Sequence, residues 1–127
     1  MTLLLKLFLI FVENNVKVHL LVIDAIKAMQ NDAKAELKRV DVRIDKIRRD
    51  MYKEHRWRIR HNRPVGLADK TREKEVQQAK EALEATACML RRHIRDYGDT
   101  ICRIREIRRG NSKKNIHTIV ENLFTSL

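Results

Sequence analysis

The chain has 127 residues, of which 28 are Lys or Arg and 17 are Asp or Glu, so its formal net charge is +11 at pH 7. With 3 glycines and 1 proline it has few residues for tight turns, which argues against an all-β fold. The excess of positive charge predicts a polyanionic partner, meaning nucleic acid, an anionic membrane surface or an acidic protein.

Residues 1–15 form an apolar N-terminal segment, "MTLLLKLFLIFVENN". Its longest uncharged apolar run, residues 7–12, is far shorter than the ~20 residues that span a membrane. We therefore expect no integral membrane span and a protein that is soluble or bound peripherally. Residues 1–23 allow two interpretations: a helix, or a β-hairpin whose second strand shows apolar alternation over residues 16–22.

A first long helix is predicted over residues 16–60, because apolar side chains recur there at alternating spacings of three and four. Two polar residues, His19 and Gln30, interrupt this series at positions where a polar side chain more often fixes register than binds a ligand. The helix should end before "HNRPVGLAD", which holds the only proline. The predicted seam residues are Val16, His19, Ile23, Ile26, Gln30, Ala33, Leu37, Val40, Ile44, Ile47 and Met51.

After a loop over residues 61–69, a second helix is predicted over residues 70–109. Asp69 or Thr71 can cap its start, and the basic segment "RRGNSKKN" ends it. Gly98 lies inside this helix at a cost of about 1 kcal/mol relative to alanine, so it marks a bend or a close approach. The predicted seam residues are Val76, Ala79, Leu83, Ala87, Leu90, Ile94, Tyr97, Ile101 and Ile104.

The two long helices should fold back on each other, because a short loop joins two apolar seams of similar length. Folding about residue 65 pairs residues whose numbers add to about 131, such as Ile44 with Ala87. A short third helix is predicted over residues 115–127, where apolar side chains share one face. The expected fold is all-α: a single domain over residues 1–127, with a long antiparallel helical hairpin that resembles a coiled coil and gains a four-helix core on dimerisation.

No catalytic residue, metal site or cofactor is predicted. The five histidines form no recognised zinc pattern, and the chain has neither a glycine-rich phosphate loop nor a nucleophile elbow. Acidic residues are interleaved with basic ones, as in "KRVDVRIDKIRRD", which is typical of ion pairs on a helix surface. Cys88 and Cys102 are too far apart on one helix for a disulfide, so we expect free thiols in a reducing compartment, the cytoplasm.

Basic residues of the first helix fall into two neighbouring columns on the side away from the seam, so the charge is sorted. This surface continues for about 35 Å at 1.5 Å per residue. We name it the basic ridge, and its members are the candidate nucleic-acid-binding residues Arg39, Lys46, Arg49, Lys53, Arg56, Arg60 and Arg63. The second helix adds the candidates Arg91, Arg92 and Arg95, and arginine suits bidentate phosphate contacts. Trp57 lies beside the basic ridge, where packing against the seam or a dimer mate is favoured over stacking on a base.

A small basic protein with a long antiparallel helical hairpin and a short third helix resembles the RNA-silencing suppressors of nodaviruses. The resemblance covers residues 16–127 as an arrangement of helices and carries no diagnostic motif. The arms here are longer, and the apolar N-terminal segment is an addition. The resemblance implies a dimeric four-helix bundle that lies along double-stranded RNA.

The predicted function is sequence-independent binding of nucleic acid. Double-stranded RNA is favoured, because a straight helix with cations about one turn apart follows phosphates better than it reads base edges. A homodimer is expected. Two alternatives stay open: a structural or inhibitory coiled-coil subunit that binds a protein partner, and a peripheral membrane protein anchored by its apolar N-terminus.

Overall fold

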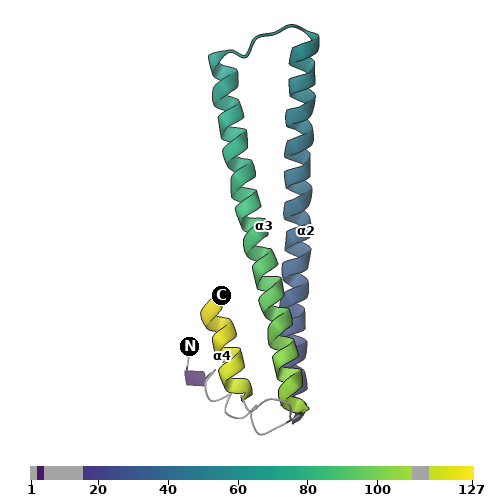
Figure 1. Cartoon of the computed structure of the whole chain (residues 1–127), viewed down its shortest axis with the longest axis vertical. Helices are drawn as coiled ribbons and strands as arrows, with labels where there is room; N and C mark the ends of the chain where they lie inside the picture. The colour runs from purple at the N-terminus through teal and green to yellow at the C-terminus, as the bar shows by residue number, and fades with distance from the viewer. Residues whose placement is uncertain (1–2, 5–15, 110–114) are drawn as a thin grey trace. The chain divides into compact units, whose positions relative to one another are not determined.

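The computed structural model describes residues 3–4, 16–109 and 115–127. Its labelled helices are α2 (Val16–Arg60), α3 (Leu67–Arg108) and α4 (Ile116–Ser126), and the described residues contain no strand. Helices α2 and α3 pack against each other as an antiparallel hairpin (Figure 1). The predicted all-α hairpin with a short C-terminal helix is therefore confirmed.

Residues 16–22 are helical, so the β-hairpin interpretation of this stretch is wrong. His19, Val22 and Ile23 are buried, which is the three-and-four spacing of a helix face and not the alternation of a strand. The other half of that interpretation lies outside the described residues. Of the apolar N-terminal segment, only residues 3–4 are described, and they are helical and exposed.

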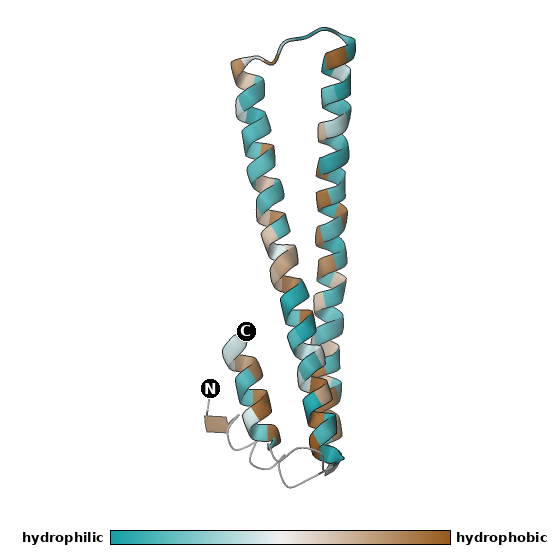
Figure 2. Cartoon of the chain, in the orientation of Figure 1, coloured by the Kyte–Doolittle hydropathy of each residue, from teal (hydrophilic) through white to brown (hydrophobic). Residues whose placement is uncertain are grey.

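The chain divides into two compact units, which are described separately. We name Met1–Lys34 with Arg92–Leu127 the three-helix unit, and Ala35–Arg91 the hairpin unit. Hydrophilic residues dominate both long helices, and hydrophobic residues form narrower bands along each helix (Figure 2). Each unit therefore depends on a limited set of apolar contacts.

In the three-helix unit, α4 packs with residues from α2 and α3 in one hydrophobic core. Asn115 begins α4, because its side chain accepts a hydrogen bond from the backbone N–H of Thr118 at 2.9 Å. Phe124 and Leu127 share the predicted apolar face but stay largely exposed. The buried core residues are Val22, Ile23, Ile26, Tyr97, Ile101, Ile104, Ile116, Ile119, Val120 and Leu123.

In the hairpin unit, ion pairs between α2 and α3 report the register directly. They join Arg48 to Glu84 and Arg91 to Asp41, both at 3.2 Å, and Arg58 to Glu73. The numbers of these three pairs add to 131 or 132, which confirms the predicted pairing about residue 65. Two further pairs nearer the turn, Arg58–Asp69 and Arg72–Glu54, add to 127 and 126. The buried apolar residues of this unit are Val40, Ile44, Ala87 and Leu90.

The predicted seam position of Ala79 in α3 is wrong. Ala79 is exposed, whereas the neighbouring Lys80 side chain is only 20% exposed and its ammonium lies 3.9 Å from Glu84. Between Val76 and Leu83, a seam residue at position 79 gives spacings of three and four, and one at position 80 gives four and three. Lysine can bury its aliphatic stem while its charge reaches a carboxylate, so an apolar residue is not required at a seam position.

The ends of the two long helices are set by backbone hydrogen bonds. Asn62 has a φ of 48° and donates to the carbonyl of Ile59, while the N–H of Arg63 reaches the carbonyl of Arg58 at 3.1 Å. This pattern ends α2, because an asparagine tolerates the left-handed conformation. Helix α3 begins three residues before the predicted start, and Asp69 accepts from the N–H of Gly66 at 3.3 Å. Asp69 therefore caps α3 from inside its first turn.

Candidate nucleic-acid interface

All seven residues of the basic ridge are exposed in the hairpin unit. Six of them lie on α2, at positions that return to the same side of the helix after every second turn. Because α2 ends at Arg60, the regular part of the ridge is about 32 Å long at 1.5 Å per residue. Arg63 lies in the turn beyond the helix, so it does not extend the ridge as a helical column.

Most cations of the basic ridge have no acidic partner in the part of the chain that the structure describes. Arg39 is the exception, because its guanidinium Nε donates to Glu36 at 2.9 Å. Among the described residues, the other five on α2 make no ion pair with a carboxylate. We name them the open cations, and they are Lys46, Arg49, Lys53, Arg56 and Arg60.

The carboxylates near the end of the hairpin are held by arginines that lie off the ridge. The nearly buried Arg58 contacts Glu54, Asp69 and Glu73, and Arg72 also contacts Glu54 and Asp69. Burial alone would lower the pKa of the Arg58 guanidinium. The hydrogen bond to Glu73 and the surrounding carboxylate charges outweigh burial and raise the pKa above its ordinary value. This acidic charge is thus turned toward the seam and away from the basic ridge.

Two exposed aromatic rings accompany the ridge. The guanidinium of Arg56 lies 5.6 Å from the ring centre of Tyr52, and that of Arg63 lies 5.3 Å from the ring of Trp57. Trp57 also stacks on His61, with ring centres 4.2 Å apart. Such contacts restrain arginine side chains while leaving their charge accessible. Sequence reasoning missed Tyr52, although its spacing of four from Arg56 on a helix is a signal for this contact.

The predicted residues on α3 do not join the ridge. Arg91 is exposed, but it bonds Asp41 at 3.2 Å and so helps to close the hairpin. Arg92 and Arg95 are exposed and belong to the three-helix unit. Among the described residues, neither has an acidic partner. The surface that the hairpin unit assembles therefore consists of the open cations with Arg39 and Arg63 at its ends.

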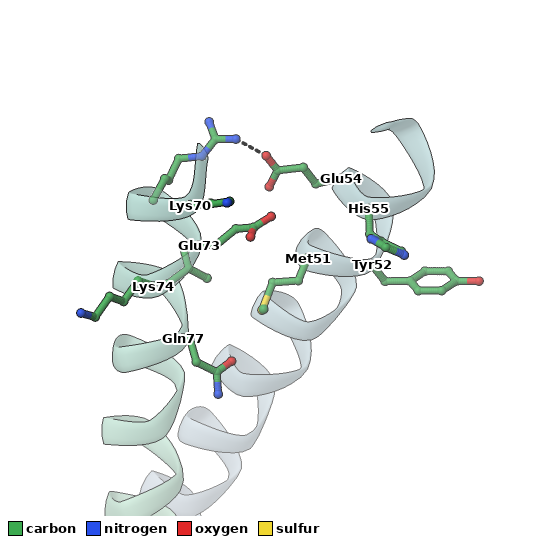
Figure 3. Close-up of a pocket in the computed structure, with 10 residues that line it drawn as sticks. Met51, Tyr52, Glu54, His55, Lys70, Glu73, Lys74 and Gln77 are labelled. Carbon is green, nitrogen blue, oxygen red and sulfur yellow. Dashed lines mark hydrogen bonds and ion pairs between the residues drawn. The ribbon is translucent and has the colours of Figure 1, made fainter. Parts of the chain in front are cut away.

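A hollow of about 730 Å³ lies between α2 and α3 near the turn. Met51, Glu73 and Gln77 point into it, whereas Tyr52 and Lys74 point away (Figure 3). Its lining combines carboxylates with cations. It therefore does not present one sign of charge, in contrast to the basic ridge.

Within the described ranges, no group of three or more His, Cys, Asp or Glu side chains is placed to hold a metal ion. No helix in the described part of the chain is both long and apolar enough to cross a membrane. Cys88 and Cys102 are exposed free cysteines. Comparison with protein-family models, with curated proteins and with solved structures gives no match.

Proposed function

We propose that this chain is a non-catalytic, sequence-independent nucleic-acid-binding protein, and that double-stranded RNA is its ligand. The observation that carries this proposal is the separation of charges in the hairpin unit. Five exposed cations lie along one side of α2 without acidic partners among the described residues, while Glu54, Glu73 and Asp41 bind arginines elsewhere. A protein that needed the charge only for solubility would gain nothing from this sorting.

The geometry favours a duplex over base-specific recognition. A helix with cations at intervals of one to two turns meets successive phosphates but presents few groups that can read base edges. Double-stranded RNA is recognised mostly by shape and by backbone contacts across its shallow minor groove. The proposal includes a homodimer, a cytoplasmic location and a role as a suppressor of RNA silencing.

A double charge reversal on the ridge tests the proposal. The variant Lys46→Glu/Arg49→Glu should weaken binding to a duplex RNA at least about 100-fold in about 0.1 M salt, because it removes two phosphate contacts and adds two repulsive charges. Fluorescence anisotropy measures the affinity, and circular dichroism verifies the helical content. Duplex DNA and single strands, titrated alongside, identify the preferred ligand.

The matched control is Lys70→Glu/Lys74→Glu, which changes the charge equally on α3 of the same unit. We expect this control to reduce affinity less than about tenfold, because both lysines lie off the ridge. The salt dependence adds a second readout: five open cations predict a slope of about −4.5 for each bound chain in a log–log plot. Equal losses in the two variants would reject the ridge as the interface.

Exposed apolar residues favour a second candidate function, a protein-binding helical subunit. Ile59 is 63% exposed and Leu67 is 83% exposed, close to the turn of the hairpin. Such side chains make no favourable contact with phosphates, whereas a protein surface can bury them. The substitution Ile59→Ser/Leu67→Ser separates the two functions: it should leave RNA affinity within about threefold if the ridge is the binding surface.

A further inference from the structure

The two flanks of the seam in the hairpin unit differ in charge. On one flank, Arg48 bonds Glu84 and Arg91 bonds Asp41, so ion pairs bridge α2 and α3. On the opposite flank, between residues 75 and 90, no ion pair among the described residues joins the two helices. One flank of the hairpin is thus bridged by ion pairs. We name the other flank, which has none in this range, the open flank.

Between residues 76 and 90 the open flank of α3 carries no charged residue, and Glu75 lies at its end. Its residues recur at spacings of three and four, so they share one face of the helix. They are Ala79, Ala82, Thr86 and Met89, three of them exposed and Thr86 half-buried. The seam residues next to this face, Ile47 and Leu83, are only half-buried. Apolar surface therefore continues from the seam onto this flank and has no cover within the hairpin unit.

The open flank of α2 carries Arg43 and Asp50, seven residues apart and both exposed. Neither makes an ion pair with another described residue. In an antiparallel contact between two copies of α2, a two-fold axis midway between these residues sets each arginine against the partner's aspartate. The charges of this flank are self-complementary.

The same axis fits α3 independently. An axis between residues 46 and 47 of α2 corresponds to a point between residues 85 and 86 of α3 in the register of the Arg48–Glu84 ion pair. About that point, Ala82 faces Met89 of the second copy, so a small side chain meets a larger one. Charge pairing on α2 and size pairing on α3 thus select the same antiparallel arrangement.

We infer that a second copy of this chain docks on the open flank, with α2 on α2 and α3 on α3, antiparallel about residues 46 and 85. The inference rests on the homodimer proposed above but not on nucleic-acid binding. It accounts for the small core of the hairpin unit, because four helices bury the half-exposed seam that two leave open. The other open cations lie outside this contact, whereas Lys46 of each copy lies close to the axis.

Complementary charge reversal tests the arrangement. The full-length variant Arg43→Asp sets aspartate against aspartate at both contacts, and Asp50→Arg sets arginine against arginine. We expect each variant alone to raise the dissociation constant of the dimer about 100-fold, since like charges at an interface are strongly repulsive. An equimolar mixture of the two variants should form a heterodimer, because both contacts are again attractive. Light scattering after size-exclusion chromatography measures the mass.

The double variant Arg43→Asp/Asp50→Arg should recover the homodimer, and this recovery also shows that the single variants can fold. The control Arg49→Asp, on the basic ridge, should keep twice the chain mass while it loses RNA affinity. A monomeric wild-type chain, or single variants that dimerise like the wild type, would overturn the inference. So would a mixture that stays monomeric. A wild-type chain that forms the dimer but binds no RNA would instead count against the proposed function alone.

Discussion

Gln30 of α2 and Gly98 of α3 lie close together in the three-helix unit. The side-chain amide of Gln30 donates to the backbone carbonyl of Ile94 at 3.0 Å. A Cβ atom on Gly98 would lie 3.3 Å from the same amide nitrogen, which is tighter than ordinary contact. The glycine therefore marks a close approach, one of the two possibilities that the sequence left open.

This contact predicts a non-additive pair of substitutions. Gly98→Ala alone should change the free energy of unfolding by less than about 0.5 kcal/mol, because ~1 kcal/mol of helix propensity is offset by displacing the Gln30 amide. In a Gln30→Ala background, Gly98→Ala should stabilise the protein by about 1 kcal/mol. Urea unfolding of the four proteins measures the coupling. The same effect in both backgrounds would show that Gln30 does not constrain Gly98.

His19 is a buried polar residue of the three-helix unit. It is 7% exposed, and neither ring nitrogen has a hydrogen-bond partner among the described residues. A buried polar atom without a partner costs about 1–3 kcal/mol. The predicted seam position is confirmed, but nothing in the described chain uses the imidazole for register.

We therefore expect His19→Leu to raise the free energy of unfolding by about 1 kcal/mol, since leucine has similar size and no polar atoms. The exposed His55→Leu is the matched control and should stay within about 0.5 kcal/mol of the wild type. Thermal or urea unfolding measures both. A destabilised His19→Leu variant would mean that the ring has a polar role in the folded chain.

At the scale of the helices, the alternating spacing of apolar residues was enough to predict α2, α3 and their register. A helix face is fixed by its period of 3.6 residues, and two faces of equal length joined by a short turn have few ways to pair. The choice between Ala79 and Lys80 could not be made this way. It depends on the position of Glu84, whose carboxylate lies 3.9 Å from the lysine ammonium.

Arg58 could not be predicted from the pattern either, because it occupies a seam position with a full charge. Its side chain is 10% exposed and contacts carboxylates from both helices. Only the folded hairpin brings Asp69 and Glu73 to it from α3. Sequence distance alone does not reveal such a contact.

Arg58→Lys should lower the midpoint of thermal unfolding by about 3 °C, because one ammonium cannot replace a planar guanidinium among three carboxylates. Arg48→Lys is the matched control at an exposed ion pair and should change the midpoint by less than about 1 °C. Differential scanning fluorimetry measures both. An equal shift in the two variants would show that burial of Arg58 adds nothing.

The pH dependence of the Arg58 effect follows from the direction of its shift. The pKa of Arg58 is raised, so its contribution is present below the unfolded pKa and is lost only as the pH rises through the folded pKa. Both values lie far above neutrality. The difference between Arg58→Lys and the wild type should therefore stay constant between about pH 6 and pH 8.

For the whole molecule, the net charge of +11 is a property of the sequence, but the fold determines which cations are free to contact phosphate. The sequence placed Arg39 and Arg91 among equivalent candidates for phosphate contact. In the folded chain, Glu36 and Asp41 already bind them, and the open cations remain. The proposed ligand thus depends on which arginines the carboxylates leave exposed.

The amino-acid sequence by itself determined the all-α class, the two seams, the turn and the columns of basic residues, since these follow from the period of one helix. Only the tertiary structure decided which cations are open, why Gly98 is tolerated and which flank of the hairpin lacks ion pairs. Those features join residues that are far apart in the chain, and helical periodicity does not specify which polar side chains meet across the two helices.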